Sequence, residues 1–139
     1  MIVVAATLLS ACVSFLPTFD ESLHKSLEAA VSDINKVGAA VALNPQPPFE
    51  RIEPFYVSAL GHLRGAEATA TGITRNYSGS PATGSAQLLA GAIAECRAAV
   101  ERMLTRHREG SFTHSLFEQS NLAGGTCAIP TLMSSRLRR

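Results

Sequence analysis

The chain has 139 residues and a formal net charge of +1, with 46% hydrophobic residues, 6% aromatic residues and no tryptophan. This length suits one domain rather than two, and the near-neutral charge gives no electrostatic case for nucleic acid as a partner. Alanine supplies much of the hydrophobic content. That composition favours closely packed helices over a β-sandwich.

The chain opens with MIVVAATLLSACVSFLP, a stretch without a single charge. A membrane-spanning helix needs about 20 mainly apolar residues, and Pro17 ends this run too early. A secretory signal has an apolar stretch of roughly 7 to 15 residues followed by small residues at the cleavage site. Residues 2–9 followed by Ser10 and Ala11 fit that description. The pattern therefore predicts a signal peptide over residues 1–11, and the alternative is an apolar helix in a cytosolic core.

The tetrad Leu9, Ser10, Ala11 and Cys12 resembles the lipobox of bacterial lipoproteins. The resemblance implies that the peptide is cut before Cys12, that Cys12 carries lipid and that residues 12–17 form a lipidated tether. Val13 in place of Asp implies the periplasmic face of the outer membrane. The implied partners are the membrane, through this lipid, and an envelope protein. Signals of this kind carry Lys or Arg ahead of the apolar stretch, so we expect the natural start to lie upstream.

Once Cys12 is assigned to lipid, two of the three cysteines remain, Cys96 and Cys127. Exported proteins occupy an oxidising compartment where disulfides persist, so we predict a disulfide between this pair. Closing a loop of about thirty residues stabilises a fold by roughly 3 to 4 kcal/mol in the chain-entropy description. The alternative is two unrelated thiols, one in a core and one in a loop.

Three long segments repeat apolar residues at three- and four-residue steps, which is typical of one helix face. The first is predicted to begin at Thr18, with Glu21 completing a capping box, and to end at NPQPP. The second is predicted to begin near Glu53, with Pro54 in its first turn. The third is predicted to begin within the linker SGSPATGS, with its apolar repeat running from Ala86. The predicted inner faces are Phe19, Leu23, Leu27, Ala30, Ile34, Val37 and Val41; then Ile52, Tyr56, Ala59, Leu63, Ala66, Ala70 and Ile73; then Leu89, Ala92 or Ile93, Cys96, Ala99 or Val100, Met103 and His107.

Beyond Gly110, Ser111 is placed to cap a short fourth helix through FTHSLFEQSNL, and Gly124 and Gly125 then turn the chain toward Cys127. We therefore predict an all-α protein, a small up-down bundle of three main helices plus a short C-terminal helix over residues 18–127. A helical hairpin that completes its core in an oligomer is the alternative. Residues 128–139 are predicted to be a basic tail, solvated or bound to anionic phospholipid.

Two features of the second helix have open interpretations. Gly61 and Gly65 give it a small-residue side, which either allows another helix to approach closely or simply weakens the helix. Glu67 stands among small apolar residues, where it is either a surface carboxylate or a buried functional acid.

Catalytic and metal-binding motifs are absent from the sequence. His24, His62, His107 and His114 form no pair at i, i+4 spacing, and the carboxylates form no pair of Glu-x-x-His motifs of the kind that binds two metals in a helical bundle. His107 is the best placed of the four, near an inner face and at a helix C-terminus where a cation suits the dipole. No hydrolase or nucleotide-binding motif is present either. We therefore expect no catalytic residue, no metal and no cofactor.

The third helix carries four arginines, Arg97, Arg102, Arg106 and Arg108, which are predicted to form a solvated stripe or to face a membrane or an acidic partner. Together these features predict a small envelope lipoprotein acting as a non-enzymatic binding or scaffolding module. The alternatives are an immunity or exclusion lipoprotein that blocks a toxin or phage component, and a carrier of a small ligand between the helices.

Overall fold

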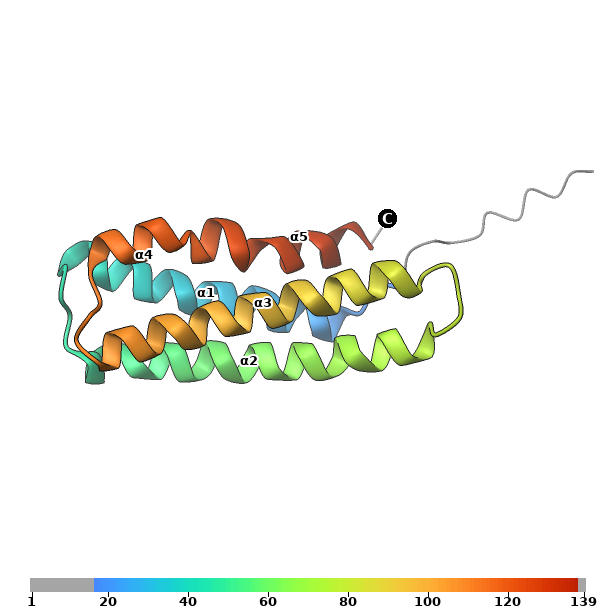
Figure 1. The fold of residues 1–139 in the computed structure, drawn as a ribbon, viewed down its shortest axis with the longest axis horizontal. Coiled ribbons are helices and arrows are strands. Elements are labelled where there is room, and N and C mark those ends of the chain that lie inside the picture. Colours follow the sequence, from blue (N-terminus) through green and yellow to red (C-terminus); the bar gives the residue numbers. More distant parts are fainter. Residues whose placement is uncertain (1–16, 138–139) are drawn as a thin grey trace, which may run out of the picture.

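The residues predicted to be apolar faces lie on the inner sides of three long helices in the computed structural model, which describes residues 17–137. The all-α prediction is confirmed: in this part of the chain there are helices and no strands (Figure 1). The helices are α1 (Glu21–Leu43), α2 (Phe49–Asn76), α3 (Thr83–Arg108), α4 (His114–Ser120) and α5 (Ala128–Arg136), with a short π-helical segment, η1 (Leu122–Thr126).

The three long helices run up and down beside one another, and α4, η1 and α5 follow in line as a fourth column (Figure 1). That column packs against α1 and α3. Every predicted inner-face residue of α1 after Phe19 is buried. The core therefore closes within one chain, and no second copy is needed to cover these helices. The core consists of Leu23, Leu27, Ala30, Ile34, Val37 and Val41 of α1, Ile52, Tyr56, Ala59, Leu60, Leu63, Ala66 and Ala70 of α2, Leu89, Ile93, Cys96, Val100 and Met103 of α3, and Phe112, Phe117, Leu122 and Cys127 beyond them.

The cap of α1 is Asp20 rather than the predicted Thr18. Asp20 Oδ1 accepts a hydrogen bond from the Leu23 backbone N–H at 2.8 Å, which satisfies one of the donors left open at a helix start. Thr18 instead bonds to a residue distant in the sequence at the same end of the bundle: its backbone N–H donates to the Tyr77 hydroxyl at 2.9 Å. The predicted capping box is wrong because this long-range contact takes up the threonine.

Other predicted helix starts also shift. Helix α2 begins at Phe49, ahead of the predicted Glu53, so Pro54 lies inside the helix rather than in its first turn. Helix α3, in contrast, begins at Thr83, inside the linker SGSPATGS, which confirms its predicted start. The cap of α4 is Thr113, not Ser111, and its hydroxyl oxygen accepts from the Leu116 N–H at 3.2 Å.

The segment between α4 and α5 turns tightly around Asn121. This residue has a left-handed backbone with φ of 44°, a conformation that asparagine tolerates better than most residues. A Cβ on Gly125 would lie 2.6 Å from Asn121 Nδ2. The predicted turn at the two glycines is thus a π-helical segment packed against the asparagine side chain, which would have to move if Gly125 carried a Cβ.

Residues 128–136, predicted to begin a tail, form helix α5. Pro130 lies in its first turn, where a missing N–H costs little, and both Pro130 and Ser134 are buried. The predicted domain boundary at residue 127 is therefore wrong, because the packed bundle continues through α5. Residues 138 and 139 lie outside the described residues.

The small-residue side of α2 does not bring another helix close. A Cβ added at Gly61 or Gly65 would meet nothing within 4 Å. The close approach occurs on α1 instead, where a Cβ on Gly38 would lie 2.9 Å from Cε1 of Phe117. Gly38 therefore makes room for the aromatic ring that fixes α4 over α1.

Candidate functional site

The predicted cysteine pair joins α3 to the start of α5. Cys96 and Cys127 form a disulfide across a sequence separation of 31 residues, with their Cα atoms 4.8 Å apart. Both are buried. The bridge ties the fourth column of the bundle to the middle of α3. Cys12, the predicted lipidation site, lies outside the described residues, as do the predicted signal peptide and all of the tether before Pro17.

A buried carboxylate between α1 and α2 was not predicted. Asp33 is only 6% exposed, and its Oδ1 accepts from Lys36 Nζ at 2.7 Å. Burial raises the pKa of Asp33, but hydrogen bonds from Lys36 and Ser58 outweigh that effect and hold the pKa below its ordinary value. His62 Nε2 lies 4.0 Å from Oδ2. Asp33 is thus a satisfied ion held by donors from both helices, and its position on the inner face of α1 was the only sequence signal for its burial.

Glu67 is an ion-pair partner. Arg97 Nε donates to Glu67 Oε2 at 2.6 Å, and its Nη1 donates to Glu101 Oε1 at 2.9 Å. These hydrogen bonds, the one to Glu67 first, raise the pKa of Arg97. Arg97 therefore joins α2 to α3 and does not belong to a free basic stripe, and Glu67 is its ion-pair partner on α2.

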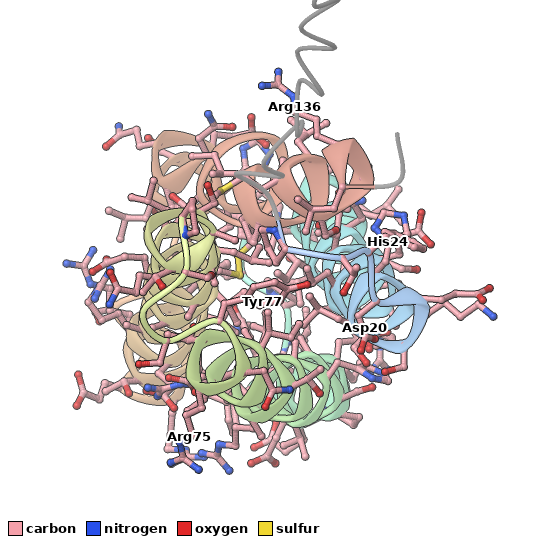
Figure 2. The ribbon with its side chains drawn as sticks, turned by 90° about the vertical axis from the view of Figure 1, so that its right-hand side faces the viewer. Asp20, His24, Arg75, Tyr77 and Arg136 are labelled. Atoms are coloured by element: carbon pink, nitrogen blue, oxygen red, sulfur yellow. A yellow bond between two sulfur atoms is a disulfide. The ribbon has the colours of Figure 1, made fainter. Side chains whose placement is uncertain are left out.

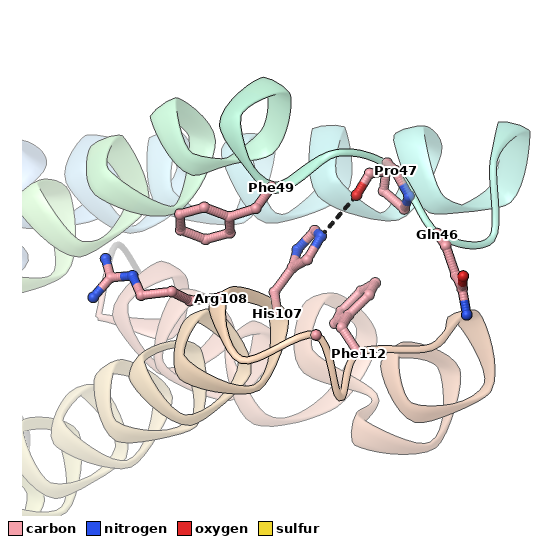
Figure 3. A pocket seen from close by; sticks show the side chains of 7 residues that line it. Gln46, Pro47, Phe49, His107, Arg108 and Phe112 are labelled. Carbon is pink, nitrogen blue, oxygen red and sulfur yellow. Dashed lines mark hydrogen bonds between the residues drawn. The ribbon is translucent and has the colours of Figure 1, made fainter.

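His107 lies at the far end of α3, in a pocket of about 280 Å³ that we call the His107 pocket (Figure 3). Its lining residues are Gln46, Pro47, Phe49, His107, Arg108, Gly110 and Phe112. The imidazole stacks on Phe112 with ring centroids 4.2 Å apart. Phe49 and Tyr56 meet it edge-on at 5.5 and 5.9 Å. The prediction placed His107 near the inner face, and the structure encloses it among aromatic rings.

The hydrogen bonding of His107 fixes its role. Nε2 lies 3.0 Å from the carbonyl oxygen of Pro47, and because a carbonyl only accepts, Nε2 carries the proton. Nδ1 is buried and has no hydrogen-bond partner. Since that atom has almost no accessible surface, a ligand seated in the pocket does not reach it. His107 therefore holds the connector between α1 and α2 against the end of α3.

The Tyr56 hydroxyl is also buried without a hydrogen-bond partner, and the Tyr56 ring lies beside His107. Burial raises the pKa of Tyr56 above its ordinary value, so the phenol stays protonated. Buried polar groups without partners are uncommon in folded proteins. Two buried polar atoms without partners, Tyr56 Oη and His107 Nδ1, thus lie next to each other's rings in an otherwise apolar cluster.

The opposite end of the bundle carries an apolar surface shared by α3 and α5, which we call the α3–α5 surface. It consists of Leu88 on α3 and Ile129, Leu132, Met133, Arg136 and Leu137 on and after α5. Leu88 is 69% exposed and Leu132 is 59% exposed. A depression of about 180 Å³ runs between the two helices and is lined by Ser85, Leu88, Leu89, Met133, Arg136 and Leu137.

Exposed apolar side chains are concentrated on this surface. Of the five large hydrophobic residues that are exposed in the described part of the chain, Leu88, Ile129 and Leu132 lie here. The α5 members recur at three- and four-residue steps, so they share one side of the helix. Single exposed apolar residues are normal, whereas clustered ones mark interaction sites.

The chain enters the bundle at this same end. The Thr18 side-chain hydroxyl and backbone N–H both bond to the Tyr77 hydroxyl, at 3.0 and 2.9 Å. The Thr83 hydroxyl, at the start of α3, donates to the Tyr77 carbonyl oxygen. Figure 2 looks onto this end, with Tyr77 near the centre and Arg136 at the edge formed by α5. The entry point, the α2–α3 turn and the end of α5 therefore lie together.

The described residues contain neither a metal-binding cluster nor a membrane-spanning helix. Between residues 17 and 137, no cluster of three or more His, Cys, Asp or Glu side chains has the geometry to hold a metal ion. Within the same range, none of the helices is both long enough and apolar enough to cross a membrane. His24 and His114 each pair with a glutamate one turn away on their own helix, Glu28 and Glu118.

Comparison with known proteins adds no relative. No protein-family model, no curated protein and no solved structure matches this chain.

Proposed function

We propose that this protein is a small lipoprotein of the cell envelope, tethered through Cys12, whose helical bundle is a non-enzymatic binding module. The proposal rests above all on the tetrad Leu9, Ser10, Ala11 and Cys12. The tetrad supports a location outside the cytoplasm, and Val13 in place of Asp favours the periplasmic face of the outer membrane. Two lipid chains or more give stable anchoring, since each buried CH₂ adds about 0.8 kcal/mol.

Two structural observations support the proposal. The chain enters the bundle at one end, pinned by the contact of Thr18 with Tyr77, so a lipid on Cys12 holds a fixed end of the domain toward the membrane. The disulfide between Cys96 and Cys127 suits an oxidising compartment. A bundle held at one end by the short tether of residues 12–17 leaves its remaining faces available to a partner.

The direct experiment replaces Cys12 with Ser in the organism that makes the protein and compares cell fractions and intact masses. We expect the wild type in the membrane fraction with the added mass of acyl chains, and the C12S variant uncut and without that mass. The Ser14→Ala variant, which changes a nearby residue outside the tetrad, is the matched control and is expected to behave as the wild type. A wild type without acyl mass contradicts the proposal.

The binding role is tested by crosslinking in intact cells, followed by identification of the attached protein. A reproducible envelope partner is expected. An immunity or exclusion factor has the same tether, and a toxin or phage component among the crosslinked proteins would favour that alternative. A carrier of small ligands gains less support, because the largest depression described, about 520 Å³, is a hollow on the outer side of α3 lined by Ala98, Glu101, Arg102, Thr105, Arg106 and Glu109.

A further inference from the structure

We propose that the α3–α5 surface is a membrane-contact face, on which Leu88 and Leu132 enter the interfacial layer of the bilayer and Arg136 binds anionic phospholipid phosphates. This inference deepens the proposed function and rests on the tether for its orientation. It assigns a role to an exposed apolar surface that a simple tethered domain does not need.

The first argument is reach. Cys12 precedes the first described residue, Pro17, by five positions, and an extended chain spans at most about 3.6 Å per residue. A lipid on Cys12 therefore holds Pro17 within about 18 Å of the membrane. Thr18 is bonded to Tyr77 at the α2–α3 turn, and α3 begins shortly after that turn at Thr83. The start of α3, with Leu88, thus faces the bilayer.

The second argument is the chemistry of the surface. Segments that lie in a membrane interface combine large apolar side chains with Lys or Arg. On α5, Leu132 and Arg136 stand four residues apart, and both are exposed. The sequence continues with Arg138 and Arg139 directly after this face. A basic residue near an anionic membrane surface contributes roughly a five-fold gain in binding.

The acidic groups that α1 contributes to this end are each engaged in a contact. Asp20 accepts hydrogen bonds from the Leu23 N–H and the Ser22 hydroxyl, both at 2.8 Å. Glu21 pairs with Lys25 at 2.9 Å, and Glu28 lies 3.3 Å from His24 Nε2. Their positions are on α1, whereas the apolar groups and Arg136 belong to α3 and α5.

The remaining exposed hydrophobic residues supply matched controls. Leu43 is 89% exposed at the last residue of α1, and a helix of 23 residues is about 35 Å long. Leu43 is therefore about that far from the end where the chain enters. Val57 is 58% exposed on α2, which lies across the bundle from α5 (Figure 1).

The absence of tryptophan allows a spectroscopic test on a silent background. Four full-length variants, Leu88→Trp, Leu132→Trp, Leu43→Trp and Val57→Trp, are produced in the native host and reconstituted on vesicles of phosphatidylethanolamine and phosphatidylglycerol. Each protein is weighed by mass spectrometry to record its lipid. The measurement is the emission wavelength and the quenching by phospholipids brominated on their acyl chains.

For the Leu88→Trp and Leu132→Trp variants we expect emission at shorter wavelength on vesicles and loss of most of the fluorescence to brominated lipid. For Leu43→Trp and Val57→Trp we expect the same emission with and without vesicles. Equal, unquenched emission from all four lipidated variants overturns the membrane-contact face and leaves the tether standing. Quenching of Leu88→Trp in protein without acyl mass supports the face while the tether fails.

Two other outcomes also overturn the proposal. A short emission wavelength without vesicles that depends on protein concentration assigns the surface to a second copy of the chain. A short wavelength without vesicles at every concentration assigns it to the apolar residues 1–16. Replacing Arg136 with Gln in the Leu132→Trp protein lacking lipid is expected to weaken vesicle binding about five-fold, and the Arg75→Gln variant, on the opposite edge of the same end (Figure 2), is the control.

Discussion

The two ends of the bundle are closed by different means. At the His107 end, aromatic rings enclose the imidazole and the connector is bonded through the Pro47 carbonyl oxygen. At the entry end, the closing contacts are hydrogen bonds between exposed groups, Thr18 with Tyr77, and Leu88 remains largely in solvent. Leu43 is exposed at the His107 end as well, but the clustered exposed apolar side chains lie on the α3–α5 surface at the hydrogen-bonded end.

The largest effect on stability is expected when the aromatic packing at the His107 end is removed. We expect Phe112→Ala to lower the free energy of unfolding by about 3 to 5 kcal/mol, because the ring is buried and its loss leaves a cavity against His107. Urea unfolding followed by circular dichroism measures it. Leu43→Ala, at the same end but exposed, is the control and should change stability by less than about 0.5 kcal/mol. Equal effects in both variants would mean that the His107 end is not closed by burial.

The disulfide between α3 and the start of α5 lies between the two ends of the bundle, and its removal has the next largest expected effect on stability. We expect the double variant Cys96→Ser, Cys127→Ser to lose about 3 to 4 kcal/mol, since the unfolded chain is no longer constrained over 31 residues. Reductant should destabilise the wild type to the same extent and leave the double variant unchanged. Finding both thiols free by mass spectrometry without reductant would refute the pairing.

A smaller effect is expected at the entry end. Ser134 is buried, and its hydroxyl donates to the Thr131 carbonyl oxygen at 2.8 Å. Ser134 Oγ also lies 2.7 Å from His24 Nδ1. Replacing Ser134 with Ala should cost about 1 kcal/mol, the usual net value of such a bond. Ser135→Ala, whose hydroxyl bonds only within its own helix at the surface, serves as the control. A loss as large as that of Phe112→Ala would erase the difference between the ends.

The smallest expected effect is on the pH dependence of stability, through Asp20 at the entry end. The Leu23 N–H first, and then the Ser22 hydroxyl, hold the pKa of Asp20 below its ordinary 3.8. A group whose folded pKa is lowered stabilises the fold above the unfolded pKa, and this gain is lost as pH falls through the folded value. Between about pH 5 and pH 2, the wild type should lose roughly 0.3 to 1 kcal/mol more than Asp20→Asn, which keeps the capping oxygen without the charge. Thermal unfolding at several pH values measures the difference, and parallel curves would exclude it.

Much of the fold could be predicted because three helices bury continuous apolar faces. Leu23, Leu27 and Ile34 recur at helical spacing, and the structure buries them as predicted. Helix α5 was missed because its buried positions are Pro130 and Ser134, which give no apolar period. Asp33 was missed because a charged residue is assigned to solvent by default, and the contributions of Ser58 and His62 on α2 to its environment cannot be read from the sequence.

The site residues divide in the same way. The cysteine pair could be predicted from counting, because assigning Cys12 to lipid left two cysteines. The role of His107 could not, since its bond to Pro47 joins residues 60 positions apart. Likewise, the clustering of Leu88 with Leu132 appears only when α5 is seen to pack beside α3.

The pinning of Thr18 to Tyr77 has a mechanical consequence. A pulling force applied ahead of Pro17 is carried first by the two hydrogen bonds to the Tyr77 hydroxyl and then by α1, which packs against both α2 and α5. The disulfide loop of 31 residues cannot extend, which shortens the fully stretched chain by about 100 Å. Under load, the domain should therefore yield in one step as α1 leaves the core, with the disulfide setting the limit of its extension.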